Sequence, residues 1–329
     1  MKNINNLQNL ILIAFVLLFT FSCSVKDIEP TSEYINYKGN IAFVAEQNSN
    51  LTTFVQALEI TDLFFTLKND GPYTVFAPSN TAFASFLATN GYATIDDVPV
   101  STLKKVLQNH FVRTKLMSAQ LVTGYVKSVA TKTVSAVPYQ YSLFINTTSG
   151  VLINGGSTNG GSKVITADIN ATNGVIHIID NVMKLPTIVN HAVSNPNFSS
   201  LVSALTSAGQ PNYIATLSGT TAYTVFAPTN SAFTSLNTEL APGGLASVSA
   251  TDLTKVLNYH VVTGTTVASS LTQGLIINTL QTPQTVAIDL VGGAKIVDAR
   301  SRVSNIIVTN LVCSNGVIHA IDKVLLPIF

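Results

Sequence analysis

The feature that most constrains the fold of this chain is an internal repeat. The segment YTVFAPSNTAF, residues 73–83, returns as YTVFAPTNSAF at 223–233. Further along, LKKVLQNHFV at 103–112 returns as LTKVLNYHVV at 253–262. Both matches keep the same spacing, so the duplicated segment is far longer than either match alone.

A third matched block closes each copy. NGVIHIIDNVMKLP at 173–186 returns as NGVIHAIDKVLLP at 315–327, and the second copy is eight residues shorter ahead of this block. Three blocks in unchanged order predict two copies of one domain, at 37–187 and 188–329. With 329 residues, 47% of them apolar, the chain is large enough to bury a core in each copy.

The first block predicts a strand that turns sharply into a helix. The β-branched and aromatic residues of YTVF favour a short strand, which ends at Pro78. Ser79 or Asn80 can then cap a helix whose apolar side chains recur at helical spacing. The second copy keeps the same corner with Pro228, Thr229 and Asn230.

The third block predicts a hairpin followed by a buried strand. Asn173-Gly174 and Asn315-Gly316 are favoured two-residue turn sequences, and the strand after each has apolar side chains on both faces. Short β-rich runs separated by Gly, Asn and Pro precede this block in both copies. Helices first and strands after predict an α+β domain with a mostly antiparallel sheet.

Four of the five histidines occupy repeated positions. They form two pairs, His110 with His260 and His177 with His319. A metal site would require them to converge with Asp180 or Asp322. A histidine on an apolar face is more often neutral and held by a buried hydrogen bond, and we predict this structural role for all four. The two aspartates are predicted to accept hydrogen bonds from backbone N–H groups.

Composition excludes several classes of function. Lysine and arginine (17) balance aspartate and glutamate (16), so the chain lacks the basic surface of a nucleic-acid-binding protein. It contains no GxSxG, HExxH, P-loop, CxxC or GxGxxG motif. We therefore predict no catalytic residues, no metal and no cofactor, and an enzyme is the least favoured of three alternatives.

The N-terminus predicts export. Residues 10–21 are an apolar run too short to span a membrane, which indicates a signal peptide at 1–22. Cys23 follows at the place of the acylated cysteine in the bacterial lipobox, although Thr20 stands where that motif has leucine; a plain signal peptide is the alternative. A tether at 23–36 follows, and its Lys26-Asp27-x-Glu29 resembles the surface-export signal of Bacteroidetes lipoproteins.

A lipid anchor would determine where the protein is located and that it is attached to a membrane. A lipid on Cys23 would hold the protein to a membrane of the cell envelope, in a Bacteroidetes-type cell the outer membrane, with surface exposure left open. It would also leave Cys313 as the only other cysteine, so no intramolecular disulfide could form. Cys313 lies in an apolar stretch, and we predict a buried, unreactive side chain.

The three blocks together resemble the fasciclin domain, an adhesion module of surface proteins. TVFAP-[ST]-N-x-AF, the helix that ends in histidine, and NGVIHxID match it in order, twice. The resemblance implies that each copy is a wedge-shaped β-sandwich of about seven short strands with N-terminal helices. It covers nearly all of the chain after the tether.

The resemblance also implies candidate binding residues. In periostin-like members of the family, an Asp-Ile pair and a Tyr-His pair are implicated in integrin-mediated adhesion. The matching positions here are Asp168-Ile169 in the first copy and Tyr259-His260 in the second. Neither copy has both pairs, because Asn109-His110 and Asn310-Leu311 stand at the other two positions.

These observations predict a non-enzymatic interaction protein. The first hypothesis is adhesion to a protein or matrix component through the tandem domains, where two weak sites on one chain would give avidity. The alternative is a surface glycan-binding accessory protein of a nutrient-uptake system, which exposed tyrosines gathered on one face would favour.

Overall fold

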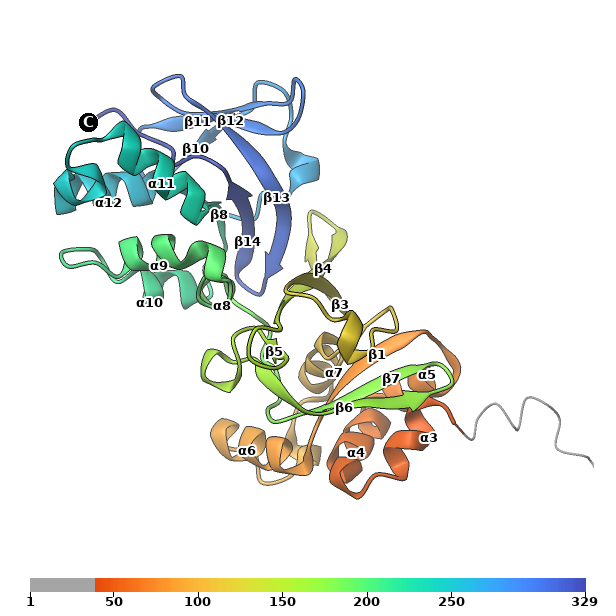
Figure 1. Ribbon diagram of the computed structural model, residues 1–329. Coiled ribbons are helices and arrows are strands. Elements are labelled where there is room, and N and C mark those ends of the chain that lie inside the picture. Colours follow the sequence, from red (N-terminus) through yellow and green to blue (C-terminus); the bar gives the residue numbers. More distant parts are fainter. Residues whose placement is uncertain (1–38) are drawn as a thin grey trace, which may run out of the picture. The chain divides into compact units, whose positions relative to one another are not determined.

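The computed structural model describes residues 39–329, in which each copy of the repeat forms its own helices and strands (Figure 1). Domain 1 begins with helices α3 (Ile41–Glu46), α4 (Thr52–Ile60) and α5 (Leu63–Asn69), strand β1 (Tyr73–Pro78) and helices α6 (Asn80–Asn90) and α7 (Val100–Asn109). It ends with strands β2 (Phe111–Val112), β3 (Gly124–Val134), β4 (Val137–Asn146), β5 (Leu152–Ile153), β6 (Ser162–Ala171) and β7 (Gly174–Ile179).

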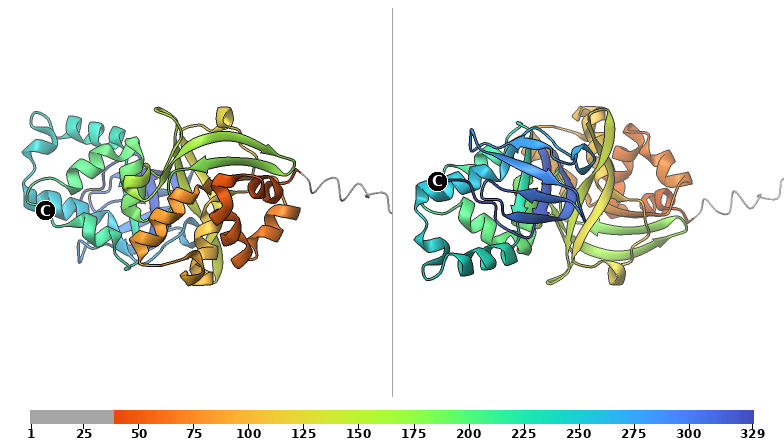
Figure 2. Two further views of the ribbon diagram at one scale, coloured as in Figure 1. Left: turned by 90° about the horizontal axis from the view of Figure 1, so that it is seen from below. Right: turned by 90° about the horizontal axis from the view of Figure 1, so that it is seen from above.

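Domain 2 repeats this order. Its helices and first strands are α8 (Ile188–Ser194), α9 (Ser199–Leu205), α10 (Tyr213–Ser218), β8 (Tyr223–Pro228), α11 (Asn230–Glu239), α12 (Ala250–Tyr259) and β9 (Val261–Thr263). The remaining strands are β10 (Ile276–Asn278), β11 (Thr285–Asp289), β12 (Lys295–Val297), β13 (Val303–Cys313) and β14 (Gly316–Ile321). The helices lie together on one side of these strands (Figure 2).

Each domain contains one seven-stranded sheet. The order is β2-β1-β7-β6-β5-β4-β3 in domain 1, and β9-β8-β14-β13-β12-β11-β10 is the same order in domain 2. Only the pairs β1–β7 and β8–β14 are parallel, and every other neighbouring pair is antiparallel. The predicted α+β fold with a mostly antiparallel sheet is confirmed.

The two parallel strands of each sheet have side chains buried on both faces. In β1, Val75 packs into the core beneath the helices, and its neighbour Phe76 packs into a second core with Leu143 and Ile153. This alternation is possible because successive side chains of a strand point to opposite faces. All residues of β7 and β14 are buried, which confirms the prediction from the apolar third block.

The hairpin ahead of the third block accounts for the different lengths of the copies. Strands β3 and β4 pair from Gly124–Ile145 out to Val134–Val137. The corresponding strands β10 and β11 pair over three residues only, from Ile276 to Asn278. The second copy therefore lacks the outer part of this hairpin.

The turn between β6 and β7 differs from the prediction. Ala171 pairs with Gly174, so residues 172–173 form the turn and the glycine begins the strand. Glycine is required because a Cβ at residue 174 would lie 2.1 Å from the Tyr73 carbonyl oxygen. The Asn-Gly sequence thus serves close contact between strands, and the predicted central pair of the turn is wrong by one residue. Gly316 has the same relation to Tyr223.

The predicted signal peptide, the tether and Cys23 lie outside the described residues. Within residues 39–329, no helix has both the length and the apolar character needed to cross a bilayer.

Candidate functional site

The strand-to-helix corner of domain 1 is held by two polar side chains. Ser79 caps α6, because its hydroxyl accepts a hydrogen bond from the Ala82 N–H at 3.2 Å. Asn80 reaches the N-terminal helices: its Oδ1 accepts from the Thr53 N–H at 3.0 Å and its Nδ2 donates to the Ser49 carbonyl at 2.9 Å. Pro78, directly before them, is the last residue of β1. The motif therefore ties α4 to the corner.

The corner of domain 2 keeps only part of this arrangement. Asn230 again accepts from a helix N–H, that of Ser200, and donates to the Pro196 carbonyl. Thr229 occupies the cap position after Pro228, but its hydroxyl pairs with the Ser231 hydroxyl and makes no capping bond. The prediction that both copies use the same cap is wrong for Thr229.

A second pair of asparagines, which the motif analysis treated only as turn residues, fastens the helices to the hairpin. Asn315 is buried; its Oδ1 accepts from the Ile188 N–H at 3.0 Å and its Nδ2 donates to the carbonyls of Leu217 and Gly219. Asn173 makes the same three kinds of bond in domain 1. The only signal in the sequence was their exact repetition.

His110 and His260 are structural. In His110, Nδ1 donates to the Val106 carbonyl at 2.7 Å and Nε2 accepts from the Met183 N–H at 2.9 Å. His260 makes equivalent bonds to Val256 and Leu325. Burial lowers the pKa of each ring to about 4, so both are neutral at pH 7 with no ring nitrogen free for chemistry.

His177 lies beside a serine and an aspartate without forming a catalytic triad. Its Nε2 donates to the Leu116 carbonyl at 2.9 Å and its Nδ1 accepts from the Asp168 N–H at 3.2 Å. Ser118 donates its hydroxyl to Asp168, not to the histidine. A nucleophilic serine needs the histidine as its base, so this arrangement cannot activate Ser118. In domain 2, His319 donates to the Thr266 carbonyl in the same way.

The repeated aspartates of the third block bind backbone. Asp180 accepts from the Lys163 N–H at 2.7 Å, and Asp322 accepts from the Asn305 N–H at the same distance. Both therefore fasten the end of the buried strand to its neighbour. Among residues 39–329, no group of three or more His, Cys, Asp or Glu side chains is placed to hold a metal ion.

The family's candidate binding pairs are placed very differently. Asp168 lies on β6 with φ 65° and a side chain that is 35% exposed. Hydrogen bonds from the Ser118 hydroxyl and N–H hold the pKa of Asp168 below its usual value. Ile169 is half-buried against the core of domain 1. This pair is partly accessible, and its carboxylate is already engaged.

The second pair is inaccessible. Tyr259 is fully buried; its hydroxyl donates to the Thr285 carbonyl at 2.6 Å and accepts from the Ala299 N–H at 2.9 Å. Its neighbour His260 is buried as described above. The two pairs lie in different domains, and Asn109 and Asn310 stand at the complementary positions. Asn109 is buried, and Asn310 accepts from the Ala268 N–H much as Asp168 does from Ser118.

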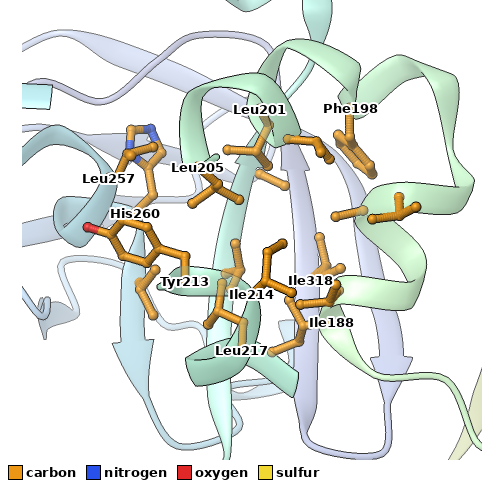
Figure 3. A pocket seen from close by; sticks show the side chains of 17 residues that line it. Ile188, Phe198, Leu201, Leu205, Tyr213, Ile214, Leu217, Leu257, His260 and Ile318 are labelled. Carbon is orange, nitrogen blue, oxygen red and sulfur yellow. The ribbon is translucent and has the colours of Figure 1, made fainter. Parts of the chain in front are cut away.

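Domain 2 contains a small cavity and an open groove. The first, about 20 Å³ beneath α8–α10, has an apolar lining that includes Phe198, Leu201 and Ile318 (Figure 3). It has room for about one water and is a packing gap. The second is an open groove of about 510 Å³ whose uncharged lining includes Ser203 and Ser207.

The residues of this groove differ from those at the same positions of domain 1. The counterparts of Ser203 and Ser207 on α4 of domain 1 are the larger Gln56 and Ile60. The Gln56 amide donates to Asp96 at 3.1 Å. This bond holds the segment between α6 and α7 against α4.

Comparison with known proteins settles the family. The model of the fasciclin domain matches residues 49–186 and 196–327. The chain belongs to the fasciclin family. It is 28% identical to transforming growth factor-beta-induced protein ig-h3 of Sus scrofa over 265 residues, 79% of this chain and 35% of that protein. It therefore spans about a third of the length of that relative.

Two further relatives cover more of their own length. A fasciclin-like arabinogalactan protein of Arthroderma benhamiae is 29% identical over 308 residues, 89% of this chain and 66% of that protein. The solved FAS1 domain pair of the insect cell adhesion molecule Fasciclin I superposes with a TM-score of 0.55 over 85% of this chain and 98% of that one, at 20% identity. At this level of identity, the comparison with the solved domain pair shows a shared tandem fold and no shared function.

Proposed function

We propose that this fasciclin-family protein is a non-enzymatic adhesion or interaction protein of the cell envelope, anchored by a lipid on Cys23 and binding a protein or matrix component. The observation that carries the proposal is the use of the motif side chains. His110, His260 and Tyr259 are buried and hydrogen-bonded inside the fold. These side chains cannot contact a partner, so a partner would bind to exposed residues outside the motifs.

The composition of that surface supports a neutral partner. Only 10% of the residues are charged, so long-range steering contributes little. The fold is shared with a domain pair from an insect cell adhesion molecule, which agrees with the proposal at the level of architecture. Of the family's candidate residues, Asp168 and Ile169 are partly accessible, and Asp168 carries the polar group that a partner can reach.

Capture of partners from intact cells by the full chain tests this proposal. Asp168→Ala is compared with Ser118→Ala, which removes the bond from the serine hydroxyl, keeps the bond from the Ser118 N–H and leaves the carboxylate in place. Loss of a protein partner in the first variant only would assign a contact to the carboxylate. Retention in both would place the binding surface elsewhere, and failure to capture any envelope or matrix component would count against adhesion.

Glycan binding is the second candidate because of the open groove beside α9. Its uncharged walls carry hydroxyls and the amide of Asn237, groups that can bond sugar hydroxyls. The tyrosines of the described part are all buried or half-buried, so they offer no stacking platform, and adhesion to protein is favoured. A glycan array with the full chain and with a Ser203→Gln variant distinguishes glycan binding from protein adhesion. The variant introduces into the groove the glutamine that domain 1 has at the equivalent position. Binding that the variant abolishes would favour the glycan function.

A further inference from the structure

The outer face of the domain 2 sheet carries a row of apolar side chains. Ile276, Ala287, Val297 and Val303 are direct cross-strand neighbours on β10–β13, so they point to the same side of the sheet. Ile276 is 58% exposed and Val303 44%, and the two between them are half-buried. We call these four residues the apolar row.

The register of the sheet gives the counterpart of this row in domain 1. Asp180 and Asp322 fix the alignment of β6 with β13, because each accepts from the equivalent backbone N–H. Following the pairs across the sheet, Ile276 and Ala287 correspond to Tyr125 and Phe144, which also face each other on neighbouring strands. The domain 1 position is therefore aromatic.

In domain 1 this position is covered by the first helix of domain 2. Residues 39–329 form one compact unit, and within it α8 lies against Tyr125. The His191 ring packs on the Tyr125 ring with centroids 5.5 Å apart, and the Asn195 amide donates to the Tyr125 hydroxyl at 3.3 Å. Nearby, Asn190 and Asn159 each donate a side-chain amide to the backbone carbonyl of the other at 2.8 Å.

The counterpart of α8 is α3, the first helix of domain 1. Their alignment is fixed because the N–H groups of Ile41 and Ile188 bind equivalent asparagines. At the positions of Asn190 and His191, two of the residues by which α8 contacts domain 1, α3 carries Phe43 and Val44, and Asn195 has its counterpart in Asn48. Both are half-buried apolar side chains with part of their surface in solvent.

We infer that α3 of one molecule docks on the apolar row of a second copy, in the same manner as α8 covers the sheet of domain 1. Phe43 and Val44 on α3 and the four side chains of the apolar row are apolar, whereas the pair already in contact is joined by amides and rings. The contact joins different surfaces of the two copies, so it is head-to-tail and produces a ring or an open chain.

The proposed contact between copies is smaller than the contact between the two domains of one chain. Between the domains, the long β3–β4 hairpin adds bonds from the Lys127 ammonium to the Asn310 carbonyl at 2.7 Å and from Lys132 to Ser314 at 3.1 Å. The hairpin of domain 2 is too short to repeat them. In the contact between the domains, Val312 is buried against Tyr141. The residue of domain 1 equivalent to Val312 is Asn170, which is exposed. Association between copies is therefore weak and reversible.

Sedimentation equilibrium of the purified full chain in density-matched detergent tests the inference. The concentration series reaches about 1 mM, where weak contacts become visible. The average mass is expected to rise with concentration. Ile276→Asp and Phe43→Lys should each weaken association by about tenfold or more, because each places a charge in an apolar contact. The control is Ile165→Asp, whose side chain is 55% exposed on β6 and lies outside both surfaces.

Mixing the two variants gives the decisive result. A head-to-tail contact predicts that Ile276→Asp and Phe43→Lys chains pair with each other although neither associates alone, because the intact α3 of the first variant can dock on the intact apolar row of the second. A chain that stays monomeric throughout the series overturns the inference. So does association that either variant leaves unchanged in protein shown by circular dichroism to be folded. Since the sample contains only this chain, the outcome is independent of any adhesion partner.

Discussion

The two domains share the buried hydrogen bonds that join their elements and differ on the outer faces of their sheets. Asn80 and Asn230 make the same bonds to the N-terminal helices, and His110 and His260 accept equivalent N–H groups. The outer sheet faces diverge, with Tyr125 covered in one copy and Ile276 exposed in the other. The comparison teaches that the repeated motif preserves a fold, and that the copies diverge on the outer sheet face, which in domain 1 is occupied by α8.

The largest effect is expected at the glycines that begin β7 and β14. Gly316→Ala would place a Cβ 1.9 Å from the Tyr223 carbonyl oxygen, and Gly174→Ala does the same in domain 1. Each is expected to destabilise its own domain by roughly 4 kcal/mol. Limited proteolysis with mass spectrometry would show which domain opens. Gly219→Ala is the control, and a resistant Gly316→Ala protein would contradict the requirement for close approach.

Next in size are the asparagines that bind the helices to the hairpin. Asn315→Ala leaves a buried N–H and two carbonyls without partners and should lower the free energy of unfolding by about 3 kcal/mol. Asn173→Ala should cost less, because one of its bonds is exposed to water. Urea unfolding measures both. Equal losses under about 1 kcal/mol would show that these bonds do not hold the helices.

Acid should destabilise both domains through their buried histidines. Burial lowers the pKa of His110 and His260 to about 4 and that of His191 to about 3, all below the unfolded value of 6.5. The unfolded chain then binds protons that the folded chain excludes, so stability is lost as pH falls from 6.5 towards 4. The slope is about 1.4 kcal/mol per pH unit for each histidine.

His191 sharpens the comparison, because its counterpart in α3 is Val44. His191→Val should remove one histidine's share of the acid sensitivity and leave the rest. Urea midpoints between pH 7.5 and 4.5 measure this share. An unchanged slope would mean that His191 is not excluded from protonation in the folded protein.

The smallest predicted effect separates the two helix caps. Ser79→Ala should cost about 1 kcal/mol, because it removes the bond to the Ala82 N–H. Thr229→Ala should lower the free energy of unfolding by only about 0.3 kcal/mol, since Thr229 makes no capping bond. Thermal unfolding resolves the difference, and a larger loss at Thr229 would reverse the assignment.

The sequence was sufficient for the parts of the fold that depend on local pattern. The double three-block match predicted two fasciclin domains, and apolar residues on both faces of the third block predicted a strand buried on both sides. The cap at Ser79 also followed from local chemistry. Thr229 did not, because a threonine at the cap position has a choice of partners and Ser231 lies within reach.

The candidate site depended on long-range contacts that no local pattern records. The motif marks Tyr259 as a candidate binding residue, and only the fold shows that its hydroxyl is bonded to Thr285 and Ala299. The asparagine bonds join residues about a hundred positions apart, as between Asn315 and Leu217. The apolar row became visible only when the sheet register aligned it with Tyr125.

The most direct test of the central claim is partner capture from intact cells by the full chain and by Tyr259→Phe, both held well below their unfolding temperatures. The variant loses the two hydrogen bonds of the buried Tyr259 side chain and keeps the surface unchanged, so the account predicts lower stability with the same captured partners. Loss of capture by folded Tyr259→Phe protein would contradict the claim that the repeated motif serves the fold and that binding belongs to the exposed faces.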